Sequence, residues 1–454
     1  MIPAFTCRRP ALQKPLCAAV LCGCLTWGTV QAAEPDYLRS EAPVEDSVLK
    51  LKDIIGRGLQ PAVKAARRAV RLLPDGLDPF WQNSTLNLKP RTYYFDRRRD
   101  NTTDSRAWAA GGALEYRSGL WQDRVSFGTT VFTTQKLYGP HDRSGSGLLK
   151  PVQEGFTVLG EAYLDIRIAD ENKLRLFRQS LNLPYVNKHD IRMIPNMFEA
   201  LTITNGEDPR FNYIAGHVEQ IKQRDSDKFI HMSEAAGAEG SKKGLSMAGA
   251  RFALSDKVHV GAISHYSWDV FNTFFAEADG GWALSDRLAV RLSGQFTDQR
   301  SVGDELVGSF DTYNVGLRVA ASYGGGVLTL AYSHTDNGAG IRNPYGGFPG
   351  YISIIVQDFN RAGEDAWLIG VSYDFKHASL PGFSGFVNFA SGDGRTDGGA
   401  DEDEYDITVD YRPPEGFFDG LWLRTRVAHV DQHGANANDF TDYRVIVNYT
   451  VPLF

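Results

Sequence analysis

The amino-acid sequence predicts an all-β protein, a transmembrane antiparallel β-barrel of about 18 strands. Three observations favour this class. Apolar and polar residues alternate along many short segments, which is the two-residue period of a β-strand. Short turns alternate along the chain with long polar connections, as in outer-membrane barrels. No apolar run long enough for a transmembrane helix follows residue 40. The chain is also rich in Gly (46), Phe (26) and Tyr (19), which suits strands and turns.

The first 33 residues are expected to be a secretory signal peptide. Basic residues at positions 8, 9 and 14 precede a mostly apolar run, and this run ends at the small-residue site Val30-Gln31-Ala32. Such a segment is removed during export, here after Ala32 or Ala33. A lipoprotein signal is the alternative, because Cys24 follows a small residue. All four cysteines lie in this segment, so the mature chain is expected to have neither a thiol nor a disulfide.

Residues 34–83 are predicted to form an amphipathic helical N-terminal extension. Between Asp46 and Leu73, apolar residues recur at helical spacing and alternate with basic residues. The sequence Leu73-Pro74-Asp75-Gly76 then ends the pattern. We expect a periplasmic helix that packs on the barrel mouth. Two alternatives are a helix inside the lumen and a helix that lies on anionic lipid of the inner leaflet.

Residues 84–454 are predicted to form the barrel. The motif Ala-Leu-Ser-Asp-Lys/Arg occurs at 253–257 and again 30 residues later, which fits successive hairpins joined by tight Ser-Asp turns. Long polar connections lie at 139–155, 182–198, 335–350 and 391–406. In outer-membrane barrels the short turns are periplasmic and the long loops extracellular. At roughly 20 residues for a strand and its connection, the segment holds about 18 strands, with about 16 as the alternative.

Basic side chains share the inward face of three strands that barrel closure brings together. In residues 419–429, leucine, threonine and valine share one face while Arg424 and Arg426 share the other. The last strand places Arg444 on the polar face, and the first strand does the same for Lys89 and Arg91. Closing a barrel sets the first strand beside the last. The sequence therefore predicts one basic wall inside the barrel.

Such a wall suits a water-filled pore for anionic solutes. A guanidinium group binds a carboxylate through two charge-assisted hydrogen bonds, so a carboxylate solute can pass from one arginine to the next. The alternative is that each arginine pairs with an acidic neighbour such as Asp165 or Glu161 and only braces the barrel. We expect too few acidic residues on these three strands to neutralise all five basic ones.

Several motifs resemble those of the OprD family of substrate-specific outer-membrane porins. They are RTYYFDR at 91–97, GSGLLKP at 145–151, LPYVNKHDIRMIPNMF at 183–198 and ISIIVQDFNRAGEDAWLIGVSYDF at 352–375. The resemblance covers roughly residues 84–454. It implies a monomeric barrel of about 18 strands in which the third loop and a later loop narrow the pore.

The resemblance also implies roles for particular residues. Arg91, Arg424, Arg426 and Arg444 match an arginine ladder that lies opposite an acidic patch. The third loop would constrict the pore at Tyr185, Asp190 and Arg192.

The implied function is that of an outer-membrane porin for passive, selective diffusion of small carboxylates, namely amino acids and aromatic or other organic acids. One departure from the family concerns the later loop, where YGGFPGYIS (345–353) is apolar and lacks an acidic residue. We therefore expect neutral or anionic carboxylates to be preferred over basic amino acids. The resemblance does not account for the helical extension.

Other functions are less well supported by the sequence. A structural barrel, or a lipid-acting hydrolase, with a plugged lumen is the alternative. The chain has neither a Gly-x-Ser-x-Gly elbow nor a His-Glu-x-x-His motif, and we expect no catalytic residue. The acidic run at 401–404 could hold divalent ions, but such a run is usually a solvated loop. No metal or other cofactor is predicted.

The expected partners follow from location and charge. Removing residues 1–33 takes away three basic residues and no acidic one, so the net charge of −7 becomes −10, which argues against nucleic acid. We expect a location in the outer membrane of a Gram-negative cell, with small organic acid or amino-acid solutes, lipopolysaccharide and phospholipid as partners. The terminal Phe454 resembles the signal that the barrel-assembly machinery reads, although it lies one step out of phase with the outward row.

Overall fold

A computed structural model describes residues 78–454 apart from 170–171, 206–209, 415, 417 and 435–436. The predicted signal peptide, and the predicted helix within 34–83 up to residue 77, lie outside the described residues. The described part begins with a four-residue helix, α3 (Pro79–Gln82), for which the Asp78 side chain accepts a capping hydrogen bond from Phe80 N at 2.8 Å. None of the described helices is long and apolar enough to cross a membrane.

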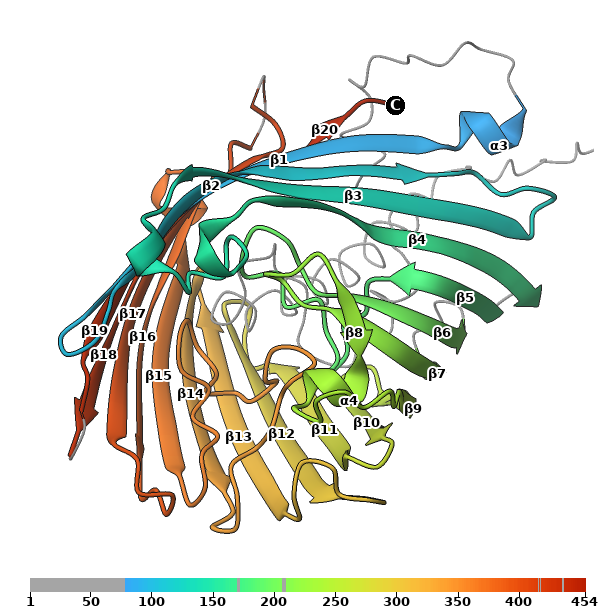
Figure 1. The fold of residues 1–454 in the computed structure, drawn as a ribbon. Coiled ribbons are helices and arrows are strands. Elements are labelled where there is room, and N and C mark those ends of the chain that lie inside the picture. The colour runs from blue at the N-terminus through green and yellow to red at the C-terminus, as the bar shows by residue number, and fades with distance from the viewer. Residues whose placement is uncertain (1–77, 170–171, 206–209, 415, 417, 435–436) are drawn as a thin grey trace, which may run out of the picture.

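The strands of the described chain form a single antiparallel sheet that closes on itself. Along the barrel wall each strand pairs with the following wall strand, β9 follows β7, and β19 pairs with β1 (Figure 1). Two short strands, β8 and β20, pair only with β7 and β1, so eighteen strands form the barrel wall and the predicted number is confirmed. The wall strands are β1 (Thr85–Arg99), β2 (Ser105–Arg117), β3 (Val125–Tyr138), β4 (Phe156–Ala169), β5 (Asn172–Gln179), β6 (Met197–Asn205), β7 (Phe211–Lys222), β9 (Leu245–Ser255), β10 (Val258–Ser267), β11 (Phe271–Ala283), β12 (Leu288–Ser301), β13 (Asp311–Tyr323), β14 (Gly326–Thr335), β15 (Asp365–Asp374), β16 (Phe383–Asp393), β17 (Asp401–Tyr411), β18 (Leu421–His433) and β19 (Phe440–Tyr449).

The remaining elements are short and lie in connections or at the chain end. They are β8 (Phe229–His231), α4 (Met232–Ala235), β20 (Val451–Pro452) and the 3-10 helices η4 (His141–Arg143), η5 (Pro151–Gln153) and η6 (Phe375–Ala378).

Short and long connections alternate as the sequence predicts. One end of the barrel carries tight turns such as 256–257 and 324–325, and the other carries the longest connections, among them 180–196 (the third loop) and 336–364 (the seventh loop). The prediction of a long loop at residues 391–406 was wrong. Residues 391–406 are not a single connection, because β16 extends to Asp393 and β17 begins at Asp401. The acidic run at 401–404 is therefore part of a strand.

The two faces of each strand differ as expected for lipid outside and a polar lumen inside. On β18, Leu423 points outward and is 38% exposed, whereas Arg424 points inward and is 0% exposed. Outward aromatic side chains contact one another across strands near the end with long loops. Ring centroids of Trp367 and Phe389 are 5.0 Å apart, and those of Phe389 and Tyr405 are 4.8 Å apart. Such a row is typical of the interface region of outer-membrane barrels.

Loops from the long-loop end fold back into the barrel and fill much of it. In Figure 1, β8, α4 and the green connections around them lie inside the ring of strands. Leu183 and Tyr185 of the third loop pack with Phe348 of the seventh loop against inward-facing wall residues such as Phe275. These apolar contacts leave only a restricted space within the barrel.

Candidate solute cavity in the barrel lumen

A cavity of about 530 Å³ lies between the inward loops and the strand wall. The wall contributes arginines from β1, β18 and β19, while the third loop, residues 223–225 of the connection after β7 and the seventh loop complete the lining. Among the residues that the structure describes, five arginines but only two aspartates line this space. They are Arg97, Arg192, Arg224, Arg426 and Arg444, with Asp225 and Asp358.

Arg426 and Arg444 of the predicted basic wall both line the cavity. They are direct cross-strand partners on β18 and β19. Arg444 Nη2 donates to Asp442 Oδ2 at 2.7 Å and to the main-chain oxygen of Ile355 at 3.2 Å. Arg426 Nε donates to Thr408 Oγ1 at 3.1 Å. The protein therefore fixes one side of each guanidinium group at the cavity wall.

Arg97 is a cavity residue that the sequence analysis missed. Its Nε and Nη2 atoms donate to the two oxygens of Asp442 at 2.5 and 2.8 Å, so Asp442 lies between Arg97 and Arg444. One buried carboxylate thus holds two guanidinium groups side by side. Alternation along the first strand could have revealed Arg97, because it lies two residues beyond the inward-facing Phe95.

Arg424 does not line the cavity. Its Nε and Nη2 atoms donate to Asp410 at 2.7 and 2.8 Å, and its guanidinium group lies 4.6 Å from the ring centroid of Trp422. The bracing interpretation therefore describes this residue better than the solute-binding one. Its acidic partner Asp410 lies on the neighbouring strand β17, outside the three strands on which we expected too few acidic residues.

Lys89 and Arg91 also lie outside the cavity lining. Lys89 pairs with Glu115 on β2. Arg91 donates to both oxygens of Asp190, at 2.6 and 3.2 Å, and to the main-chain oxygen of Arg192 at 2.6 Å. Arg91 therefore attaches the third loop to the first strand.

The third loop places its three predicted constriction residues differently. Arg192 lines the cavity, Asp190 pairs with Arg91, and Tyr185 is buried with its hydroxyl donating to Thr297 Oγ1 at 2.7 Å. Burial alone would raise the pKa of the Asp190 carboxyl, but the charge and hydrogen bonds of Arg91 outweigh it. The pKa of Asp190 therefore lies below its ordinary value of 3.8. Of the three, Arg192 is the one that meets the open space.

His189 is a further lining residue whose protonation would oppose loop docking. Burial and then the nearby Arg224 and Arg192 hold its pKa well below 6.5, although Asp190 acts in the opposite direction. Because His189 binds a proton less readily when the third loop is docked, docking is strongest above about pH 6.5 and weakens as the pH falls, by up to about tenfold per pH unit. We expect single-channel conductance at pH 5 to rise or fluctuate relative to pH 7.5.

The matched variant for this prediction is His189→Asn, which cannot gain a proton. It is expected to lose the difference between pH 5 and pH 7.5. Titration of Asp190 does not contribute to this difference, since its pKa lies below 3.8 and the carboxyl group stays ionised from pH 5 to pH 7.5. Equal conductance traces at the two pH values in the unmodified protein would contradict the prediction.

A model of the OprD family of outer membrane porins matches residues 78–453. The chain belongs to this family. Its family and fold are those of channels, and this porin is located in the outer membrane of a Gram-negative cell. No curated protein matches the chain.

Solved structures of related porins share the fold of this porin. OccK9 (OpdG) of Pseudomonas aeruginosa has a TM-score of 0.76 and 23% identity, and the match covers 83% of this chain and 100% of that one. OpdK of Pseudomonas aeruginosa, solved with vanillate, has a TM-score of 0.75 and 21% identity, with 82% and 100% covered. A BenF-like porin from Pseudomonas fluorescens Pf-5 has a TM-score of 0.76 and 21% identity, with 82% and 100% covered.

Arg224 is a further cavity residue that the sequence analysis missed. It lies in a loop, where the sequence has no periodic pattern that predicts the direction of its side chain. Among the residues that the structure describes, no three His, Cys, Asp or Glu side chains are arranged to hold a metal ion.

Proposed function

We propose that this porin lets small carboxylate solutes diffuse passively through a cavity lined by arginines. The observation that carries the proposal is the composition of that lining, in which five arginines accompany two aspartates. In a narrow space with a low-dielectric wall, such an excess of one charge concentrates its field and attracts solutes of the opposite charge. Anions are therefore expected to enter more readily than cations of the same size.

Arg426, Arg444 and Arg97 are the proposed solute contacts on the wall, and Arg192 and Arg224 are those on the loops. A planar guanidinium group suits a carboxylate, since it offers two parallel donors. The Asp442 carboxylate accepts hydrogen bonds from both Arg97 and Arg444 and reduces the net positive charge of this group. Weak binding at several neighbouring groups allows a solute to enter and also to leave, which a diffusion channel requires.

The apolar part of the lining favours carboxylates with an apolar body. Ile191, Phe348, Ile355 and Val356 line the same cavity as the arginines. OpdK was solved with vanillate, an aromatic carboxylate, which supports this substrate class for the present chain. We expect aromatic or other organic acids to pass better than basic amino acids, whose side chains carry the charge of the arginines.

Uptake into proteoliposomes tests the proposal with a matched pair of solutes. Vanillate and vanillyl alcohol have the same ring and differ at the carboxylate. At pH 7.5 we expect protein-dependent uptake of vanillate to exceed that of vanillyl alcohol by about tenfold, which corresponds to about 1.4 kcal/mol. Liposomes without protein supply the rate of passage through lipid. Equal protein-dependent rates for the two solutes would argue against the proposal.

The outward face supports a further part of the proposal. Leu330, Ile369 and Val409 are exposed there, below the aromatic row formed by Trp367, Phe389 and Tyr405. We propose that this surface contacts phospholipid and lipopolysaccharide, and that the barrel-assembly machinery inserts the chain.

A further inference from the structure

The barrel wall carries acidic side chains beside its arginines. Glu402, Glu404 and Asp406 share the inward face of β17, the strand next to β18. Each is at most 2% exposed. We call these three residues the acidic row. None of the three lines the arginine-lined cavity.

The seventh loop covers the acidic row with main-chain donors. Val356 N and Gln357 N donate to the two oxygens of Glu404 at 2.8 and 2.7 Å. Ile355 N donates to Asp406 Oδ2 at 3.3 Å. Three consecutive amide groups of the loop are therefore bound to two neighbouring carboxyl groups of β17.

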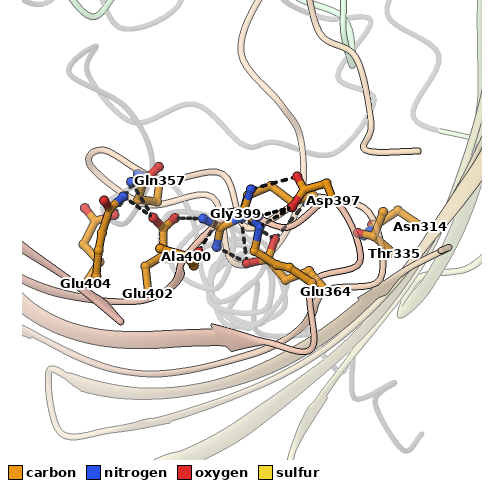
Figure 2. Close-up of polar contacts among 12 residues, drawn as sticks. Asn314, Thr335, Gln357, Glu364, Asp397, Gly399, Ala400, Glu402 and Glu404 are labelled. Carbon is orange, nitrogen blue, oxygen red and sulfur yellow. Dashed lines mark hydrogen bonds and ion pairs between the residues drawn. The ribbon is translucent and has the colours of Figure 1, made fainter. Parts of the chain in front are cut away.

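Side chains extend the same attachment toward the barrel mouth. Figure 2 shows Gln357 beside Glu402 and Glu404, with Glu364 and Asp397 farther along the network. Gln357 Nε2 donates to Glu402 Oε2 at 3.0 Å. Arg361 of the seventh loop forms ion pairs with both Glu364 and Glu402. The loop thus supplies both neutral and cationic partners for the acidic side chains.

Apolar side chains of the loop separate the acidic row from the cavity. Ile355 packs with the inward-facing Phe386 and Ala428, and Val356 packs against this cluster. Ile355 and Val356 also line the cavity, so their other side faces the solute path. Arg444 donates to Ile355 O at 3.2 Å, yet it is itself a lining residue. The loop therefore covers the carboxyl groups, whereas Arg426 and Arg444, although only 1% and 2% exposed, line the cavity.

We propose that the seventh loop determines charge selectivity by masking the acidic row, and that Glu404 and Asp406 position it. The proposal rests on the proposed function, in which arginines at the cavity select anions. A pore selects ions by the fixed charges that its water meets. With the loop docked, those charges are mainly the arginines. With the loop removed, the acidic row shares the same water and cancels much of their field.

Bilayer recordings on a loop-deletion variant test this masking. In the variant, residues 344–360 are replaced with a short Gly-Ser linker, and the wall strands are unchanged. We expect larger conductance and a reversal potential in a KCl gradient that shows loss of the anion preference. Adding Glu402→Gln, Glu404→Gln and Asp406→Asn to the deletion is expected to restore that preference. A deletion variant that stays anion-selective, or one that the three substitutions leave unchanged, would overturn the proposal.

The same recordings separate this inference from the proposed function. Absence of anion preference in the unmodified protein contradicts the proposed function. An anion preference that is present in the unmodified protein and persists in the deletion variant contradicts only the masking.

A second measurement uses the full-length chain and needs no deletion. All four native cysteines lie in residues 1–33, so the unmodified protein gives the background reaction. We compare Glu402→Cys, which is 1% exposed in the unmodified protein and keeps the loop amides bound to Glu404 and Asp406, with the cavity-lining Ser353→Cys, using a negatively charged methanethiosulfonate reagent. Cysteine at the covered position is expected to react at least about tenfold more slowly, since reaction requires the loop to open. Equal reaction rates at the two positions would overturn the masking.

Discussion

Replacing Arg424 with alanine is expected to destabilise the barrel by about 3–5 kcal/mol, because it leaves the Asp410 carboxylate buried without its charged partner. Arg424 and Asp410 are 0% and 1% exposed and form two hydrogen bonds. Trp422 Nε1 also donates to Asp410, at 2.6 Å, but a neutral donor does not replace the lost cation. Urea unfolding in lipid or detergent, followed by tryptophan fluorescence, measures the loss.

Two control variants make this prediction specific. Removing both partners in Arg424→Ala/Asp410→Ala is expected to cost less than Arg424→Ala alone, because no unpaired buried charge is left. Arg178→Ala removes an exposed ion pair with Glu199 and is expected to cost at most about 1 kcal/mol. If Arg424→Ala were no more harmful than Arg178→Ala, the bracing role of Arg424 would be refuted.

The second large effect is expected from Asp190→Ala, which detaches the third loop from the wall. Arg91 and Asp190 are joined by two charge-assisted hydrogen bonds, and losing hydrogen bonds to a charged group costs about 1.5–3 kcal/mol. That range shifts the ratio of docked to undocked loop by roughly tenfold to more than a hundredfold. We expect single-channel conductance to rise and to fluctuate between levels.

The control for this variant is Asp298→Ala, which breaks an exposed ion pair with Arg300 near the end of β12. It removes the same type of charge without touching the third loop, so conductance is expected to match that of the unmodified protein. A steady, unchanged conductance in Asp190→Ala would mean that contacts of Tyr185 and its apolar neighbours hold the loop without Arg91.

Much of the wall could be predicted from the sequence, because each strand meets two different solvents. Lipid favours apolar residues at every second position, and the lumen permits polar residues at the positions between them. The inward direction of the Arg424, Arg426 and Arg444 side chains could therefore be predicted from their alternation with apolar residues. Barrel closure then placed Lys89 and Arg91 beside them, as the pairing of β1 with β19 confirms. This alternation could not distinguish an arginine that reaches the cavity from one that binds an acidic neighbour.

The acidic strand β17 was mistaken for a loop because of its composition. Glycine and aspartate at 392–401 are typical of a connection, and the pattern continues into Glu402 and Glu404 without an apolar alternation to signal a strand. The outward positions become apolar only at Tyr405, Ile407 and Val409. This error hid the carboxylates of Glu404 and Asp406, which bind the seventh loop.

The inward loops were the least predictable part of the candidate site. Their position depends on tertiary contacts, such as Arg91 with Asp190 and Glu404 with the amides of the seventh loop, and no local period encodes these contacts. The third loop was predicted as a long polar connection from its composition, but its role in narrowing the pore came from the resemblance alone. Arg224 lies in another connection and was missed because no local period predicts where its side chain points.

The most direct test of the arginine-lined pore is the reversal potential of Arg426→Ala/Arg444→Ala in a KCl gradient. The unmodified protein is expected to prefer anions, and the double variant to lose most of that preference, since two lining charges are removed. Arg300→Ala, which removes an exposed guanidinium group outside the cavity, is expected to behave like the unmodified protein. An unchanged reversal potential in a correctly folded double variant would contradict selection by these arginines.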